Sequence, residues 1–317
     1  MHLVYIGFMK LIIQIPCYNE EATLLTTLKE IPAQYENIDC VEILIIDDGC
    51  TDKTVEIAKE FGVQHIVSHP RNLGLARAFS TGIKKAVELG ADIVVNLDAD
   101  NQYRASDIKE LLVPILDKSA DIVIGNRPIE TIKSFSPTKK LLQKLGSFVV
   151  RKISGADIKD APSGFRAFNR DAAIKINIFD NYTYTMETII QAQSKGLIIK
   201  SVPIGVNEDL RPSKLVKNNF DYIKRSCFTI LRFLIIYRPF RFFMKLSLIL
   251  FVLGLVLGGR FLYFYLTGSG QGHVQSLILC AILLLMGFQA MFFAVVADLL
   301  AINRRLLEDV QYNLKKG

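Results

Sequence analysis

The residues best suited to chemistry are two carboxylates, Asp98 and Asp100, with one alanine between them. They follow an apolar run, Ile93 to Leu97, that predicts a buried parallel strand. Ligands of open α/β sheets bind just beyond the carboxyl ends of the strands. Carboxylate oxygens, with the side-chain oxygen of Gln102 nearby, suit Mg²⁺ or Mn²⁺ bound to a substrate's phosphates. By itself this D-x-D pattern is equally consistent with an acidic turn.

The chain around this loop alternates predicted strands and helices. Apolar runs predict strands at 11–15, 41–46, 63–67, 93–97 and 121–124, and helical composition fills the segments between most of them. This alternation predicts a mostly parallel, Rossmann-like α/β sheet with flanking helices. No G-x-G-x-x-G follows the first strand, so the acidic strand ends favour a metal–nucleotide site over a dinucleotide site.

The composition separates this chain from an ordinary soluble protein. Its 317 residues are 50% hydrophobic, the mean hydropathy is +0.30 and the formal net charge is +7. A basic, apolar chain favours an anionic membrane surface or an anionic substrate. The sequence has no helix-turn-helix, zinc-finger or RNA-binding signature, so nucleic acid is not expected as a partner. The five cysteines lack C-x-x-C spacing, which indicates neither a disulfide framework nor a zinc site.

Two long apolar runs near the C-terminus predict membrane-spanning helices. Residues 246–266 and 274–297 are each long enough to cross a hydrocarbon core of about 30 Å. The loop between them has no Lys or Arg, whereas basic residues flank both runs on their outer sides. The positive-inside rule therefore predicts cytoplasmic termini and an outward-facing loop. Two basic amphipathic stretches, 136–153 and 214–243, are typical of helices that lie on a membrane surface.

Several short motifs, taken together, resemble a known family. They are Pro16-Cys17-Tyr18-Asn19-Glu20, Asp47-Asp48-Gly49-Cys50-Thr51-Asp52, Asn72-Leu73-Gly74, Asp98-Ala99-Asp100-Asn101-Gln102, Gly125-Asn126-Arg127, and the segments 160–166 and 211–215. The first four resemble the motifs of family 2 inverting glycosyltransferases with the GT-A fold. The last three resemble those of the dolichyl- and polyprenyl-phosphate sugar synthases. The resemblance covers nearly the whole chain, including the paired C-terminal membrane helices found in some members.

The resemblance implies a role for each motif. The nucleotide sugar would be bound by Pro16, Tyr18, Glu20, Asp47, Asp48, Asp98 and Asp100. The metal, Mg²⁺ or Mn²⁺, would be held by Asp98, Asp100 and Gln102. The acceptor phosphate would be bound by Arg127, Arg166, Arg211 and Lys214. The implied catalytic residues are Asp160, Glu187 and Asp100, of which Asp160 and Glu187 are the candidate bases.

The implied activity is inverting transfer of a sugar from a UDP- or GDP-sugar to a polyprenyl or dolichyl phosphate at the cytoplasmic membrane face. A phosphate acceptor is already ionised and needs no base, whereas a hydroxyl needs positioned proton removal. Two alternatives stay open: transfer to a glycolipid hydroxyl, and a catalytically silent membrane scaffold that binds sugar nucleotides. Homo-oligomerisation also stays open. The chain has no tryptophan, which excludes the Q-x-x-R-W motif of processive polysaccharide synthases.

These features divide the chain into four predicted regions. Residues 1–212 would form the cytoplasmic GT-A domain, with a nucleotide-binding half at about 9–127 and an acceptor-side half at about 128–212. Basic juxtamembrane helices would occupy 213–245, a transmembrane hairpin 246–302 and a cytoplasmic tail 303–317.

Overall fold

The computed structural model describes residues 8–128, 146–148, 150–151, 158–178, 184–207, 231–232, 235, 239–268 and 274–316. The chain divides into two compact units, with the boundary between Ser226 and Cys227. Most of the two amphipathic stretches, 136–153 and 214–243, falls outside the described residues, and so do Arg211 and Lys214.

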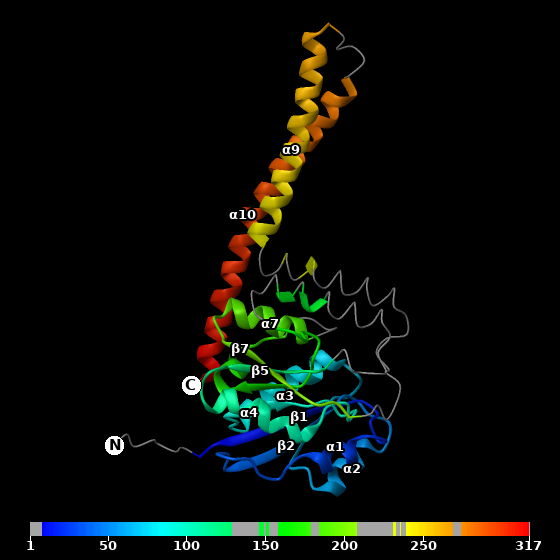
Figure 1. The fold of residues 1–317 in the computed structure, drawn as a ribbon, viewed down its shortest axis with the longest axis vertical. Coiled ribbons are helices and arrows are strands. Elements are labelled where there is room, and N and C mark those ends of the chain that lie inside the picture. Colours follow the sequence, from blue (N-terminus) through cyan, green and yellow to red (C-terminus); the bar gives the residue numbers. More distant parts are fainter. Residues whose placement is uncertain are drawn as a thin grey trace, which may run out of the picture. The chain divides into compact units, whose positions relative to one another are not determined.

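The first unit is built on a seven-stranded sheet in the order β3-β2-β1-β4-β6-β5-β7 (Figure 1). Neighbouring strands are parallel, except that β6 runs antiparallel to both β4 and β5. This confirms the predicted mostly parallel α/β sheet. The strands are β1 (Lys10–Cys17), β2 (Cys40–Asp47), β3 (His65–Ser68), β4 (Ile93–Asn96), β5 (Ile122–Asn126), β6 (Arg166–Asn169) and β7 (Ile199–Pro203).

Helices cover the sheet and explain why β1 is apolar along most of its length. Leu11, Ile13 and Ile15 pack in one core cluster that also contains residues from the helices that follow β1 and β4. Gln14 faces the other side, toward α3, where a side chain at Gly82 would collide with it. The helices of this unit are α1 (Leu24–Glu30), α2 (Thr54–Phe61), α3 (Leu75–Glu88), the 3₁₀ turn η1 (Ala105–Asp107), α4 (Ile108–Leu116), α6 (Arg170–Lys175) and α7 (Thr185–Ser194).

The strand register brings the predicted site loops to one edge of the sheet. Cys17 at the end of β1 pairs with Asp47 at the end of β2. On the other side of β1, Asn96 ends β4 and pairs with Arg166, the first residue of antiparallel β6. The carboxyl ends of β1, β2, β4 and β5 therefore share an edge with the amino end of β6.

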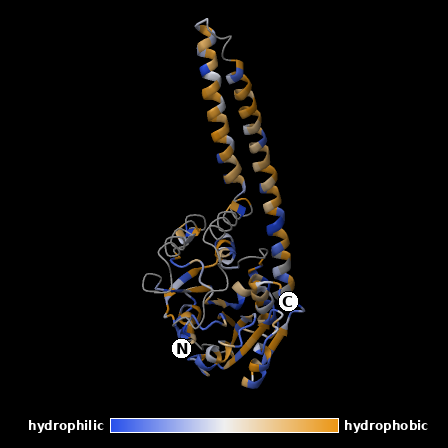
Figure 2. Ribbon diagram, turned by 90° about the vertical axis from the view of Figure 1, so that its right-hand side faces the viewer, coloured by the Kyte–Doolittle hydropathy of each residue, from blue (hydrophilic) through white to orange (hydrophobic). Residues whose placement is uncertain are grey.

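The second unit contains two long helices, α9 (Pro239–Leu266) and α10 (Val274–Lys316). Their most apolar windows have mean hydropathies of 2.2 and 2.5, and only 11% and 22% of the residues in those windows are buried. Figure 2 shows hydrophobic residues along most of both helices. By length and composition each helix could therefore cross a membrane. α10 continues to Lys316, so the residues assigned to the tail from the sequence are largely helical.

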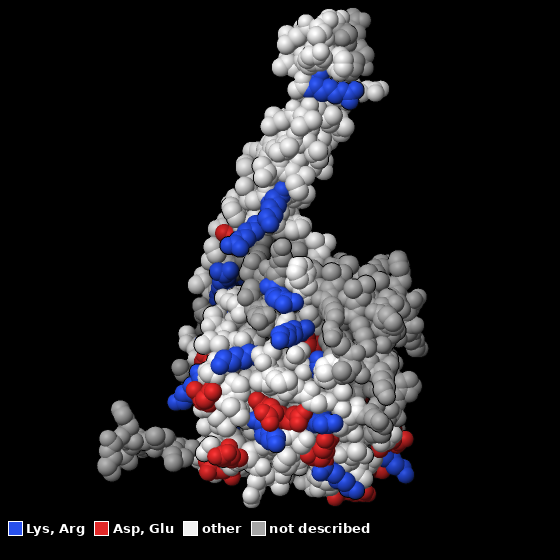
Figure 3. All heavy atoms as spheres, viewed as in Figure 1, with Lys and Arg blue, Asp and Glu red and all other residues white. Residues whose placement is uncertain are grey.

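The two helices approach each other through small residues. Ser247 of α9 donates a hydrogen bond of 2.8 Å to the carbonyl of Gly287 in α10. A side chain at Gly254 would come within 2.9 Å of Leu284, so a larger residue there would push the helices apart. The opposite faces are apolar and exposed, with few charges between the ends of the pair on the face shown in Figure 3. Such surfaces are suited to lipid.

Candidate active site

The loop after β4 holds the two carboxylates in a tight turn. Asn101 adopts a left-handed backbone conformation with φ of 58°, and the Gln102 amide donates to Asp100 Oδ1 at 3.2 Å. Thr27 of α1 donates a hydrogen bond of 3.2 Å to the carbonyl of Ala99, which attaches the loop to α1. Asp98 and Asp100 are both partly buried at the carboxyl edge of the sheet, the position predicted from the sequence.

The environment of Asp98 disfavours its charge. Burial, followed by the negative charge of Asp100, raises its pKa to about 7, although Arg127 and Arg166 act in the opposite direction. The backbone of the 160–166 loop approaches this carboxylate closely, because a side chain at Gly164 would lie 2.8 Å from Asp98 Oδ2. A cation bound between the two carboxylates would offset their repulsion and favour the ionised form of Asp98.

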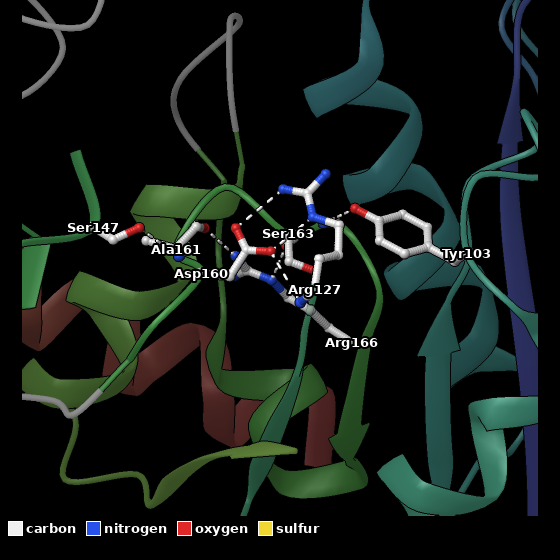
Figure 4. A network of polar contacts seen from close by, with 8 residues as sticks. Tyr103, Arg127, Ser147, Asp160, Ala161, Ser163 and Arg166 are labelled. Atoms are coloured by element: carbon white, nitrogen blue, oxygen red, sulfur yellow. Dashed lines mark hydrogen bonds and ion pairs between the residues drawn. The ribbon is translucent and has the colours of Figure 1, made fainter. Parts of the chain in front are cut away.

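Arg127, which directly follows β5, forms a buried bidentate ion pair with Asp160. Its Nε lies 2.7 Å from Oδ2 and its Nη2 lies 3.0 Å from Oδ1, while its backbone amide also donates to Oδ2. Arg127 is 9% exposed and Asp160 is fully buried. The guanidinium also lies 5.6 Å from the ring centre of Tyr103 (Figure 4). Asp160 therefore fixes the orientation of Arg127.

Arg166 has different partners from those expected of a phosphate ligand. It is fully buried, and its guanidinium donates at 2.8 Å to each of the carbonyls of Ser163, Thr185 and Ala161, and also contacts the Thr188 hydroxyl. Burial lowers its pKa to about 10. This arginine joins the 160–166 loop to the first turn of α7, and its binding of an acceptor phosphate stays a prediction.

Several residues predicted to bind the nucleotide lie at the ends of β1 and β2. Pro16 is buried within β1, while Tyr18 is 43% exposed just beyond it and can contact a ligand. The backbone amide of Glu20 donates to Thr54 at 2.8 Å, which ties the β1 loop to the start of α2. Asp47 accepts a 2.7 Å hydrogen bond from the Cys50 amide and so shapes the second loop.

Asp48, which the sequence predicts to bind the nucleotide, is hydrogen bonded to a neighbouring loop in the structure. It is 3% exposed, and it accepts hydrogen bonds from the amides of Leu73 and Gly74 at 2.9 and 2.8 Å. Its Oδ1 also lies 2.7 Å from Nδ1 of His69. Gly49, with φ of 74°, packs directly on the backbone of the same loop, where any side chain would collide. Both residues therefore fix the position of the 71–74 loop beside the carboxyl end of β2.

The remaining candidate base, Glu187, lies in the first turn of α7. It is 2% exposed and accepts a hydrogen bond from Gln191 at 3.3 Å. Tyr103 is a site residue that sequence reasoning missed, although it follows Gln102 directly. It is buried beside Arg127, and its hydroxyl accepts from the Gly164 amide at 3.0 Å. Among the described residues, no three His, Cys, Asp or Glu side chains converge on a metal position.

The chain belongs to glycosyl transferase family 2, whose sequence profile matches residues 12–176. The chain also resembles individual members of this family. It is 34% identical over 212 residues to a UDP-N-acetylglucosamine–dolichyl-phosphate N-acetylglucosaminyltransferase of Methanococcus voltae, covering 60% of this chain and 82% of that one. The chain is 27% identical over 217 residues to a polyprenol monophosphomannose synthase of Mycolicibacterium smegmatis, and this match covers 65% of this chain and 80% of that one.

A solved structure supports the GT-A fold. Glucosyl-3-phosphoglycerate synthase from Mycobacterium tuberculosis, in complex with Mn²⁺, UDP and phosphoglyceric acid, superposes with a TM-score of 0.54. The identity is 18%, and the match covers 72% of this chain and 78% of that one.

The raised pKa of Asp98 predicts how the metal-free protein responds to pH. Between about pH 4 and 7 the folded protein keeps a proton that the unfolded chain has lost, so stability should fall as pH rises through this window. Asp98→Asn should remove this dependence and, in EDTA at pH 8, stabilise the protein by on the order of 2–4 kcal/mol. Thermal unfolding at pH 5 and 8 measures the effect, with Glu110→Gln on the exposed face of α4 as control. Equal stability of Asp98→Asn and wild type at pH 8 would contradict the assignment.

Proposed function

We propose that this protein transfers one sugar from a UDP- or GDP-sugar to a polyprenyl or dolichyl phosphate, with inversion, at the cytoplasmic face of the membrane. By their names, one relative transfers N-acetylglucosamine to dolichyl phosphate and the other makes polyprenol monophosphomannose, a sugar linked to a polyprenol through one phosphate. The two membrane-length helices would keep the chain beside such a lipid.

The ion pair of Asp160 is the observation that favours a phosphate over a hydroxyl acceptor. A general base must accept a proton from the acceptor, but Asp160 is fully buried and already accepts hydrogen bonds from Arg127. A lipid phosphate, with a second pKa of about 6, is largely ionised at neutral pH and needs no such base. Asp160 would then act by orienting Arg127 toward a phosphate.

The donor's diphosphate would be bound through a divalent metal. Asp98 and Asp100 supply hard oxygen ligands, and a cation there would offset the effects of burial and of the Asp100 charge that raise the pKa of Asp98. The described residues offer no third carboxylate, histidine or thiolate to this position, so the diphosphate oxygens and Gln102 would complete the coordination. When bound, the metal would neutralise charge on the departing nucleoside diphosphate. Tyr18 and Glu20 would contact the nucleoside.

The proposal is tested by incubating the purified full chain with radiolabelled nucleotide sugars and undecaprenyl or dolichyl phosphate, followed by lipid extraction. We expect label in the lipid phase with the phosphate and not with free polyprenol. The rate should not require a group that titrates above about pH 7. Equal transfer to polyprenol or to a glycolipid would instead favour a hydroxyl acceptor. Nucleotide-sugar binding with no transfer or hydrolysis would favour the silent scaffold.

The proposed orientation predicts a labelling pattern in intact cells. The loop between α9 and α10 has no Lys or Arg and should face outward, so a cysteine introduced at Ser269 should react with an impermeant thiol reagent. A cysteine at the exposed position Glu110 should react only after the cells are opened. The wild-type chain, with its own five cysteines, sets the background. Labelling of the cysteine at position 110, but not of the one at position 269, in intact cells would contradict the proposed orientation.

A further inference from the structure

The segment after β7, residues 204–207 and hereafter the strap, is hydrogen bonded along the loop that follows β4. Each strap residue makes a contact through its backbone: the first contacts the end of β5, and the other three contact η1 and the loop. These contacts are Ile204 N to Asn126 O at 3.1 Å, Gly205 N to Asp107 Oδ2 at 2.6 Å, an antiparallel bridge between Val206 and Tyr103, and Asn207 N to Gln102 O at 3.0 Å. The strap therefore follows the loop from η1 back to Gln102.

The side chain of Asn207 extends this connection to α1. Its Nδ2 lies 2.9 Å from Oε2 of Glu30, at the end of α1, and 3.4 Å from both Oδ1 of Asn101 and the carbonyl of Tyr103. The contact with Glu30 is the shortest and involves a charged acceptor, so it is the strongest of the three. One amide thus links the strap, the loop and a helix on the nucleotide side.

The loop needs such support at the residue that Asn207 contacts. Asn101 lies between Asp100 and Gln102 and has a φ of 58°, a left-handed conformation that asparagine adopts more readily than most residues and that contacts with its surroundings stabilise further. Asn101 is only 6% exposed, and its side chain lies against Asn207. A change in this turn would move the Asp100 carboxylate directly.

We propose that Asn207 is a positioning residue that holds the turn at 98–102 in the geometry that binds the donor's metal. The inference rests on the proposed function only in assigning a divalent metal to Asp98 and Asp100. Arg211 and Lys214 follow Asn207 closely in the sequence. The strap thus ties the metal loop to the start of the segment that carries these two proposed phosphate ligands.

The test measures Mn²⁺ binding by electron paramagnetic resonance, with the purified full chain and UDP. Asn207→Ala should weaken Mn²⁺ binding roughly ten- to a hundredfold, because residues that orient metal ligands contribute effects of this size. Asn207→Asp should weaken Mn²⁺ binding further, since the new carboxylate would face that of Glu30. Glu30→Gln/Asn207→Asp reverses the hydrogen bond and should recover part of the loss. Lys109→Ala, exposed on α4, should bind Mn²⁺ as the wild type does.

Recovery by the double variant separates positioning from a general loss of structure. Mn²⁺ binding unchanged in Asn207→Ala would overturn the inference. If Asn207→Ala does not fold, the comparison between Asn207→Asp and the double variant decides, and a double variant no better than the single one would overturn it. Wild-type protein that binds Mn²⁺ and UDP but transfers no sugar to lipid phosphate would refute the proposed function and leave this inference standing. Wild-type protein that binds no Mn²⁺ would refute the inference itself.

Discussion

Asp100→Ala should reduce sugar transfer by roughly 10²–10³-fold, the loss seen when one group that stabilises developing charge is removed. The fold should remain intact, because Asp100 is partly exposed and its negative charge repels that of Asp98. Removing this repulsion would not destabilise the metal-free protein. Initial rates of label transfer into lipid, together with thermal unfolding of the same preparation, measure the two effects separately.

A matched control and a chelator complete this experiment. Glu110→Ala removes an exposed carboxylate from α4 and should leave the rate unchanged. Wild-type activity should disappear in EDTA and return with Mg²⁺ or Mn²⁺, whereas Asp100→Ala should recover little at the same metal concentration. Full activity of the wild-type chain in chelator would refute the metal assignment.

Asp160→Ala should destabilise the first unit by about 3–5 kcal/mol, since it leaves the guanidinium of Arg127 buried without its counter-charge. For a domain of this size the unfolding temperature should fall by roughly 10 °C. Arg127→Leu/Asp160→Ala should recover much of this loss, because neither charge then remains buried. Thermal unfolding of the full chain in detergent provides the measurement.

A surface ion pair provides the comparison for this buried one. Lys85 and Glu88 on α3 are 3.3 Å apart but well exposed, with side chains 40% and 65% accessible. Glu88→Ala should therefore change the unfolding temperature little. An Asp160→Ala protein as stable as Glu88→Ala would mean that water reaches the Arg127 pair and that Asp160 could accept a proton.

Strands were predicted best from the sequence where both of their faces are buried. β1, β2, β4 and β5 are apolar runs because both faces of the sheet are covered, and each was predicted within a few residues. β6 and β7 were missed, because Arg166–Asn169 and Ile199–Pro203 are short and carry polar or charged residues. The place of β6 in the sheet depends on pairing with β4, which is distant in the sequence and leaves no local pattern.

The same distinction applies within the site. The position of Asp98 and Asp100 followed from a strand end, which is a local feature. The partners of Asp48, Asp160 and Arg166 did not, because each is set by a loop or strand from elsewhere in the chain. A carboxylate or guanidinium in a motif can bind a ligand or hold a loop, and only the folded contacts distinguish these roles. Whether Tyr18, Glu20 and Gln102 touch a ligand stays a prediction.

The place of β6 has a consequence for how this protein is made. β6 lies between β4 and β5, so two strands of the predicted nucleotide-binding half are separated in the sheet by a strand from the predicted acceptor-side half. On the ribosome, β1 to β5 emerge well before Arg166, and β4 then presents an unpaired edge. Pairing over such a sequence distance is slow. We therefore expect a fragment that ends near residue 128 to aggregate, and the two halves to be unsuitable for exchange with those of a relative as independent modules.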